Sequence, residues 1–130
     1  MLGSKFQIKD TNINYINSSN NIYAEIINST CCVLPSYREG LSRFLLESLA
    51  VGRPIITSNV PGCNDLVINN SNGYLLQDIN SNELFSLFEK FSSLPHKKII
   101  DFSSFSREYS LKYDEKTINR EILSILKSLL

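Results

Sequence analysis

The 130-residue sequence lacks an excess of either charge, a long apolar run and a secretion signal. Its 13 lysines and arginines balance its 13 aspartates and glutamates, and they form no basic block or stripe, which argues against a nucleic-acid partner. No apolar run approaches the length that spans a bilayer, and the first residues do not follow the charged-then-apolar pattern of a signal peptide. These absences indicate a cytoplasmic protein.

The sequence is also poor in residues that bind metals. Its three cysteines, Cys31, Cys32 and Cys63, do not have the spacing of metal ligands, and the first two fall in an apolar run. We expect buried, unreactive thiols, as in the reducing cytoplasm. The single histidine, His96, stands beside two lysines, and we expect it at the surface.

The chain is long enough for one domain that buries about two-thirds of its unfolded surface. Its central part, residues 33–62, contains an apolar run, a polar turn, a helix-length apolar segment, a Gly-Arg-Pro break and a second apolar run. This order predicts a strand, a loop, a helix and a second strand, which is a βαβ unit. We therefore expect an α/β fold, with a parallel sheet flanked by helices.

The ends of the central helix can be predicted from capping residues. Ser42 is suited to the N-cap, Gly52 to the left-handed position after the last turn, and Pro54 prevents continuation. The residues between are almost all apolar, so we expect the helix to be buried on more than one side. Glu47 is the exception, and we expect it to face a cleft. The alternative is a solvated gap in the apolar surface.

A polar loop, residues 38–41, precedes this helix and is called the Glu39 loop below. It lies where the carboxyl end of a strand meets a helix N-terminus, the place where open α/β sheets bind ligands. Free backbone N–H groups at a helix N-terminus favour anions, and Gly40 lets a ligand approach the backbone. A glycine before a helix is common, so this feature alone does not identify a phosphate site.

The segment PSYREGLSRFLLESLAVGRPIITSNVPGCNDLV, followed by NGYLL, closely resembles the C-terminal, donor-binding half of retaining glycosyltransferases of family 4. These enzymes have the GT-B fold of two facing Rossmann-like domains, and their signature contains two glutamates seven residues apart. The matching residues are Glu39, Gly40, Glu47, Ser48, Ala50, Gly52, Pro54, Ile55, Ile56, Gly62, Val67, Asn72, Gly73, Tyr74 and Leu75. The resemblance is strong over residues 31–77 and weaker beyond them.

The resemblance implies a function in polysaccharide biosynthesis, namely transfer of a sugar, with retention, from a nucleotide-sugar donor such as a UDP-sugar to a glycan or lipid-linked acceptor. It also implies a location in the cytoplasm, peripheral at the inner face of the membrane. No cofactor or metal is expected, since no Asp-x-Asp pair is present to hold a divalent ion. We expect the site residues to be catalytic Glu39 and substrate-binding Gly40, Leu41, Ser42, Arg43 and Glu47.

Each of these residues receives a role from the resemblance. Glu47 would bind the ribose hydroxyls with its two acceptor oxygens. The backbone N–H groups of Gly40, Leu41 and Ser42 would meet the diphosphate or the sugar. Glu39 would contact the sugar or stabilise its positively charged transition state. Arg43 would touch phosphate or acceptor, or else remain solvated.

Two features of the family are missing from the chain. One is an upstream arginine–lysine pair that neutralises the donor diphosphate, and the other is the N-terminal domain that binds acceptor. We therefore interpret residues 1–130 as a single donor-binding domain truncated at its N-terminus. Residues 114–130 form a final helix that would pack on the missing domain, so we expect either a separate N-terminal half or self-association through this helix.

Two other functions remain open. The chain could be a nucleotide-sugar- or partner-binding remnant without turnover, or part of a nucleotide-sugar epimerase of the same fold. The S-Y-R-E-G-L-S-R segment resembles the transferases more than the epimerases.

The remaining periodicities predict the other elements of the domain. Alternation over residues 13–16 suggests a strand exposed on one side, and Ser19 is expected to cap a helix over residues 21–28. Strands are expected at 31–34, 55–58 and 73–76, and a short helix or turn at 64–68. Helices are expected from Asp78 or Asn80 to Ser92, over residues 95–111, and over residues 115–129 with Asp114 as the N-cap. The aromatic stripe of the helix at 80–92 is expected to pack into the core.

Overall fold

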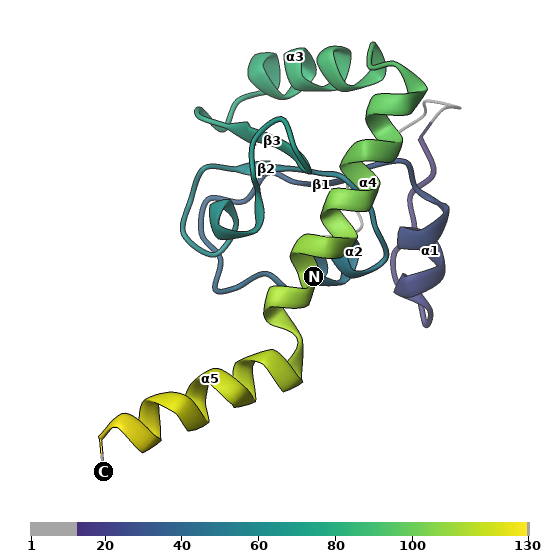
Figure 1. Ribbon diagram of the computed structural model, residues 1–130. Helices are drawn as coiled ribbons and strands as arrows, with labels where there is room; N and C mark the ends of the chain where they lie inside the picture. The colour runs from purple at the N-terminus through teal and green to yellow at the C-terminus, as the bar shows by residue number, and fades with distance from the viewer. Residues whose placement is uncertain (1–12, 130) are drawn as a thin grey trace.

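The computed structural model describes residues 13–129, which contain a parallel three-stranded sheet with helices on both faces (Figure 1). The strands follow their chain order in the sheet: β1 (Cys32–Leu34), β2 (Ile55–Ser58) and β3 (Gly73–Leu76). Cys32 pairs with Ile55, and Ile55 pairs with Gly73. The predicted α/β class, parallel sheet and flanking helices are confirmed.

Helical segments connect the strands and complete the domain. The connection from β1 to β2 contains a helix, whereas the connection from β2 to β3 contains only one short 3-10 turn. The helical elements are α1 (Ile22–Asn28), α2 (Arg43–Ala50), η1 (Asn64–Leu66), α3 (Ser81–Ser92), α4 (His96–Ser110), η2 (Leu111–Tyr113) and α5 (Glu115–Ser128). Most of them match the predicted ranges closely, because caps and apolar periodicity are local signals.

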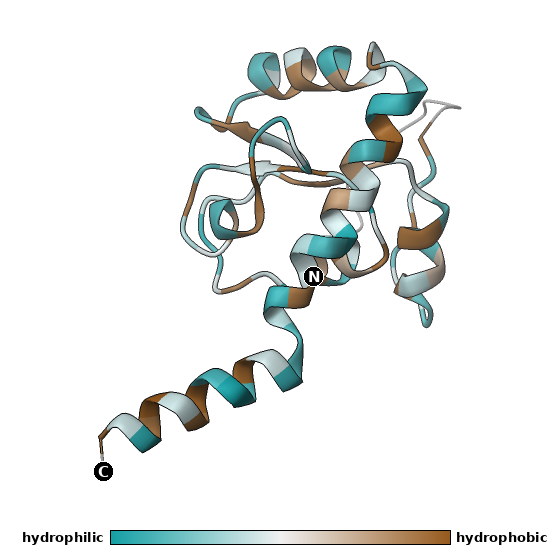
Figure 2. Ribbon diagram, in the orientation of Figure 1, coloured by the Kyte–Doolittle hydropathy of each residue, from teal (hydrophilic) through white to brown (hydrophobic). Residues whose placement is uncertain are grey.

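The central strand β2 is buried along its whole length, as expected for a parallel sheet covered on both faces. The apolar side chains separate into two clusters, one on each face of the sheet. One cluster, with Leu45, Leu49 and Leu66, joins the sheet to α1, α2 and η1. The other, with Phe91 and Phe102, joins it to α3 and α4. Figure 2 shows the strands as mainly apolar ribbons between more polar helices.

The α4 helix contributes to both clusters, because it starts on the α3 side of the sheet and ends beside α2 (Figure 1). In the middle of the helix, Phe102 is fully buried, and its ring meets that of Tyr74 of β3 edge to face with 5.8 Å between the ring centroids. Towards its end, Tyr109 and Tyr113 of the adjoining η2 pack against the other cluster. The α4 helix therefore packs against the apolar clusters on both faces of the sheet.

Two predictions about local structure are wrong. Residues 13–16 form no strand, and Ile13, Tyr15 and Ile16 are exposed. The alternating pattern has no neighbouring strand to pair with, and a strand requires one. The N-cap of α1 is Asn21, whose side chain accepts from the Ala24 N–H. The Ser19 hydroxyl instead accepts from the Asn21 N–H, and Ser19 lies three residues before the first residue of α1.

The aromatic stripe of α3 is only partly in the core. Phe91 is buried, and Leu84 and Leu87 pack beside it, whereas Phe85 and Phe88 are exposed at 61% and 43%. Since α3 covers the sheet from the outside, only the face carrying Leu84, Leu87 and Phe91 meets β3. Phe85 and Phe88 lie outside the contact between α3 and β3.

The last helix, α5, begins at the predicted N-cap Asp114 and projects away from the rest of the domain (Figure 1). None of its described residues is buried. Apolar side chains nevertheless recur along it at helical spacing, and Figure 2 shows them as apolar bands. They are Ile118, Ile122, Leu123, Ile125 and Leu126. Among residues 13–129, no helix has both the length and the hydropathy needed to cross a membrane.

Candidate functional site

The Glu39 loop meets a second loop at the carboxyl end of the sheet. The second loop, residues 59–63, follows β2 and is called the Gly62 loop. A Cβ atom on Gly62 would lie 1.9 Å from the Gly40 carbonyl oxygen and 2.9 Å from that of Glu39. Gly62 also has a φ of 82°, a left-handed conformation that favours glycine. Only glycine therefore allows the two backbones to lie this close.

The opposite side of the Glu39 loop is open. A Cβ atom on Gly40 would have no atom within 4 Å, and Leu41 is 48% exposed. Within residues 13–129, the backbone N–H groups of Gly40 and Leu41 have no hydrogen-bond acceptor. Glu39, the residue before them, is half-buried. Two adjacent free donors directly before a helix N-terminus are suited to an anionic group.

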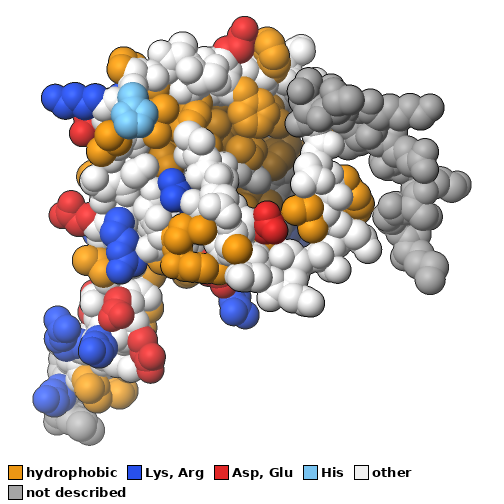
Figure 3. Space-filling view, turned by 90° about the vertical axis from the view of Figure 1, so that its right-hand side faces the viewer, with side chains coloured by type: hydrophobic (Ala, Val, Ile, Leu, Met, Phe, Trp, Pro, Cys, Tyr) orange, Lys and Arg blue, Asp and Glu red, His pale blue; other side chains and the backbone are white. Residues whose placement is uncertain are grey.

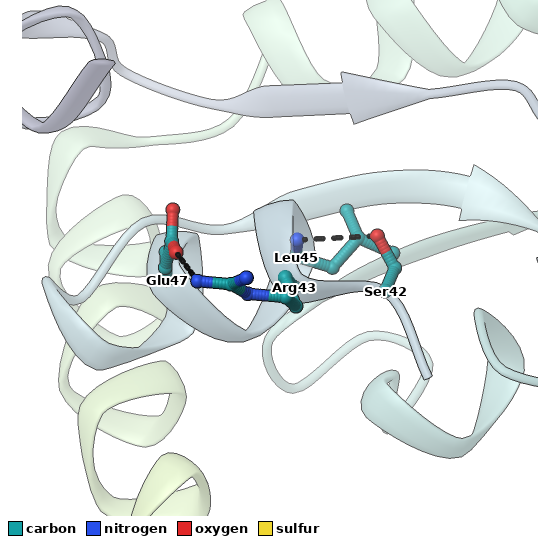
Figure 4. Close-up of polar contacts among 4 residues, drawn as sticks. All are labelled: Ser42, Arg43, Leu45 and Glu47. Carbon is teal, nitrogen blue, oxygen red and sulfur yellow. Dashed lines mark hydrogen bonds and ion pairs between the residues drawn. The ribbon is translucent and has the colours of Figure 1, made fainter. Parts of the chain in front are cut away.

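Ser42 is differently placed from its predicted role. Its hydroxyl caps α2 by accepting from the Leu45 N–H at 3.5 Å, as predicted (Figure 4). Its own backbone N–H, however, donates to the Gly62 carbonyl oxygen at 3.2 Å. The prediction that the Ser42 N–H is free to meet a ligand is therefore wrong, because contact between the two loops already uses this donor. Gly40 and Leu41 keep theirs.

Glu47 lies on the outer face of α2, one turn after Arg43 (Figure 4). The Arg43 Nη2 and Glu47 Oε1 atoms are 3.9 Å apart, and the side chains are 91% and 46% exposed. An exposed pair at this distance contributes little to stability. The rest of the helix is packed, with Leu45, Ser48 and Leu49 buried. Glu47 is thus the polar break in the helix that the sequence predicted.

Glu47 lines a pocket of about 310 Å³ between α2 and the end of α4. Apolar, hydroxyl and charged groups meet there, which suits a polar ligand with an apolar face. The lining residues are Leu46, Glu47, Ala50, Arg107, Ser110, Leu111, Tyr113 and Asp114. Glu39 does not line this pocket. Glu47 therefore faces a hollow, as expected, and the hollow is completed by residues far away in the sequence.

Several polar residues near the two loops could not be recognised as a group from the sequence. The carboxylate of Asp65 accepts from the Gly62 N–H at 3.0 Å. Beside it, Asn64 donates to the side chain of Asn59 at 2.9 Å, and Asn59 donates to that of Gln77 at 2.7 Å. Asn59 and Gln77 directly follow β2 and β3. This position was the only indication in the sequence that they lie together, because parallel strands end at one edge of the sheet.

Burial raises the pKa of three titratable groups near the site and the sheet, Tyr74, Tyr113 and Cys31. Burial, followed by the nearby Tyr109 and Asp65, raises the pKa of Tyr113 to about 12. Burial, followed by Cys32, raises the pKa of the Cys31 thiol to about 12. The three cysteines are free thiols, which agrees with the expectation of unreactive cysteines. Within the described part of the chain, no group of three or more His, Cys, Asp or Glu side chains could hold a metal ion.

The face of the molecule drawn in Figure 3 carries its charges in a mixed pattern. Figure 3 shows lysine and arginine interspersed with aspartate and glutamate on one face, including the part that projects at its lower left. No large area of one sign is visible on this face. This distribution agrees with the balanced composition. It gives no support to binding of a polyanion through a basic surface.

Comparison with known proteins gives a consistent result. The model of a family described as glycosyl transferases group 1 matches residues 5–108. A Campylobacter jejuni N,N'-diacetylbacillosaminyl-diphospho-undecaprenol alpha-1,3-N-acetylgalactosaminyltransferase is 29% identical over 87% of this chain and 30% of its own length. An uncharacterised Haemophilus influenzae glycosyltransferase is 30% identical over 96% of this chain and 35% of its own.

Among solved structures, Anabaena HepE in complex with UDP superposes with a TM-score of 0.75 at 23% identity. The match covers 85% of this chain and 30% of HepE. At this identity the likeness shows the fold alone. The chain spans about a third of the length of the curated relatives that it matches.

Proposed function

Because the chain belongs to the glycosyl transferases group 1 family, we propose that it is the donor-binding part of a retaining glycosyltransferase. The proposed reaction moves a sugar from a nucleotide diphosphate to an acceptor. The observation that carries this proposal is the pair of free backbone N–H groups on Gly40 and Leu41, directly before α2. They offer an anion-binding position beside the half-buried Glu39.

In this proposal, different residues bind different parts of the nucleotide-sugar donor. The Gly40 and Leu41 N–H groups bind the diphosphate or the sugar, and Glu39 contacts the sugar or stabilises its positive transition state. Glu47 accepts from the ribose hydroxyls in the pocket between α2 and α4. Arg43, 91% exposed one turn before Glu47, is free to move towards phosphate or acceptor. Ser42 holds the helix start rather than the ligand.

The proposed donor is a UDP-sugar, and the proposed acceptor is a glycan or a lipid-linked glycan. The donor is supported by the complex of Anabaena HepE with UDP. The acceptor is supported by the Campylobacter jejuni relative, whose name contains a diphospho-undecaprenol carrier. We further propose that donor binding needs no metal, and that the protein acts in the cytoplasm at the inner face of the membrane.

The last helix belongs to this proposal as a contact surface. Its apolar residues are exposed, with Ile122 at 48% and Leu126 at 52%. Uncovered apolar surface of this kind marks a binding surface. We propose that it packs on an N-terminal glycosyltransferase half or, when the chain is alone, on a second copy of itself.

A donor-binding module without turnover is a second candidate. It is favoured by the fact that Glu39, the proposed catalytic residue, does not line the pocket that Glu47 lines. Transfer also requires an acceptor held in line with the donor, and proximity supplies much of the rate. In this case Gly40, Leu41 and Glu47 would still bind the nucleotide sugar.

The affinity of the chain alone should be low. A helix N-terminus contributes about 0.3–2 kcal/mol towards an anion. Hydrogen bonds from ribose to a charged Glu47 add about 1.5–3 kcal/mol before ordering costs. The Glu39 carboxylate nearby repels the diphosphate. The sum is close to the roughly 4 kcal/mol that corresponds to millimolar binding.

The test is an NMR titration of the purified chain with UDP and with CMP as the control nucleotide, following the Gly40 and Leu41 amides. We expect these amides to shift with UDP at a dissociation constant of about 1 mM. We also expect no sugar transfer by the chain alone. Amides that do not respond to UDP would contradict donor binding, and sugar transfer by the chain alone would contradict the interpretation as a part of an enzyme.

A further inference from the structure

We propose that Tyr109 and Tyr113 are positioning residues for the Glu39 loop, acting through Asp65 and Gly62. The inference rests on the proposed function, because it assigns these tyrosines to the order of a loop that binds the donor. Neither their sequence spacing nor the match to the family identifies such a role. The argument follows a continuous set of contacts from the end of α4 to the Glu39 loop.

The first contact joins the two loops. The Ser42 N–H donates to the Gly62 carbonyl oxygen at 3.2 Å, and the Gly62 backbone lies directly against Gly40. The Glu39 loop therefore leans on the Gly62 loop on one side and is open on the other. Any movement of Gly62 away from Gly40 would free the Ser42 N–H and loosen the backbone that carries the two unbonded donors.

The second contact fixes Gly62. Its N–H donates to the Asp65 carboxylate at 3.0 Å. This hydrogen bond spans only three residues, so a local opening of the turn would break it. Asp65 is exposed and sits in the three-residue η1, so its local structure alone gives it little stability. Asp65 needs a further support in order to hold the Gly62 loop in place.

The two tyrosines supply this support. The Tyr109 and Tyr113 hydroxyls both donate to the Asp65 backbone carbonyl oxygen, at 3.1 and 3.0 Å. Their rings meet edge to face at 6.1 Å, and both pack against the apolar cluster under α2. The carbonyl oxygen has two lone pairs and can accept both bonds. Rigid, half-buried rings thus hold an otherwise weakly fixed turn.

The arrangement leaves the Asp65 side chain free for Gly62. The tyrosines bind the backbone carbonyl of Asp65, while its carboxylate binds the Gly62 N–H, so the two contacts can be removed separately. The Tyr113 hydroxyl is protonated, and thus a donor, throughout the neutral range, and its raised pKa extends this range to higher pH. Tyr113 also lines the Glu47 pocket, whereas Asp65 does not, which separates an effect on loop order from direct loss of a ligand contact.

The test uses the full 130-residue chain and two sets of variants. Tyr109→Phe combined with Tyr113→Phe removes both hydroxyls, and Asp65→Ala removes the carboxylate but keeps the carbonyl. We expect amide hydrogen exchange at Ser42 and Gly62 to become about tenfold faster in both, with the amides of β2 unchanged. We expect the dissociation constant for UDP to rise about fivefold, since loop order is lost before binding.

Two controls accompany the test. Asp65→Asn keeps a side-chain acceptor and should restore most of the slow exchange that Asp65→Ala loses. Tyr23→Phe removes the hydroxyl of a 56% exposed tyrosine on α1 and should change neither measurement. If amide exchange in the double variant becomes faster in β2 by the same factor as at Ser42, the variant has lost stability in general, and the proposal is overturned.

The two levels of inference fail separately. Unchanged exchange at Ser42 and Gly62 in both variants, measured without nucleotide, overturns the positioning role whether or not UDP binds. Faster exchange with an unchanged UDP dissociation constant also overturns it. If the unmodified chain does not bind UDP, the proposed function fails, and the exchange data alone then decide whether the tyrosines order the loop.

Discussion

Arg107 of α4 donates a hydrogen bond from its guanidinium to the carbonyl oxygen of Ala50, the last residue of α2, at 2.5 Å. The last carbonyl groups of a helix have no partner within the helix, and a cation there also interacts favourably with the helix dipole. Gly52, just beyond, has a φ of 74°, and a Cβ atom on it would lie 3.2 Å from the Ser103 carbonyl oxygen. Thus α4 fixes the end of the helix that carries Glu47.

Replacing Arg107 with alanine should lower the free energy of unfolding by about 1–2 kcal/mol, because a charged hydrogen bond to an exposed helix end is lost. Arg107→Lys should recover part of this, since it keeps the charge but not the planar fork. Urea unfolding of the chain provides the measurement. Arg120→Ala on the exposed α5 is the matched control and should be nearly neutral; equal losses in both would argue against the Ala50 contact.

Glu47→Gln should weaken UDP binding by about five- to tenfold, because a charged acceptor for ribose hydroxyls becomes neutral. Its melting temperature should change by only about 1–2 °C, since the contact with Arg43 is long and exposed. The measurement combines NMR titration with thermal unfolding. Glu89→Gln, at an exposed position of α3, serves as the control. A large loss of stability would instead make Glu47 a structural residue.

The chain should self-associate through α5 when it is alone. Sedimentation across a range of concentrations should show a monomer–oligomer equilibrium, because burial of apolar surface stabilises contact at about 25 cal/mol per Å². Ile122→Lys should shift this equilibrium to the monomer. Ser124→Lys, on the opposite side of the helix, should leave it unchanged. A wild-type chain that stays monomeric at every concentration would contradict the prediction.

Stability should fall at high pH through Cys31. The folded-state pKa is raised by burial from an ordinary 9.0 to about 12, so the folded chain holds the thiol proton more tightly than the unfolded chain. This contribution is fully present below about pH 9 and is lost as the pH rises towards 12. Urea unfolding at pH 8 and at pH 10.5 should show a decline that is smaller in Cys31→Ala. Equal declines would show that other groups cause the loss.

Local signals were sufficient for most of the helix and strand boundaries. Ser42 and Asp114 cap helices as predicted, and Gly52 has the predicted positive φ. Of the two predicted openings of α3, Asp78 and Asn80, the N-cap is Asn80. Caps and apolar periods act within a few residues, so they can be recognised without knowledge of the fold. The same local reasoning was wrong at residues 13–16, where a strand pattern has no partner strand.

The sequence by itself determined the α/β fold, the two spaced glutamates of the family signature and the break in apolarity at Glu47. Only the tertiary structure decided which groups surround them. Arg107 and Tyr113 are far from Glu47 in the sequence yet line its pocket. The Ser42 N–H, which the sequence predicted to be available to a ligand, donates instead to the Gly62 carbonyl oxygen. Contacts of this kind depend on how α4 crosses the layers and how the strands end together, and no local pattern of residues contains that geometry.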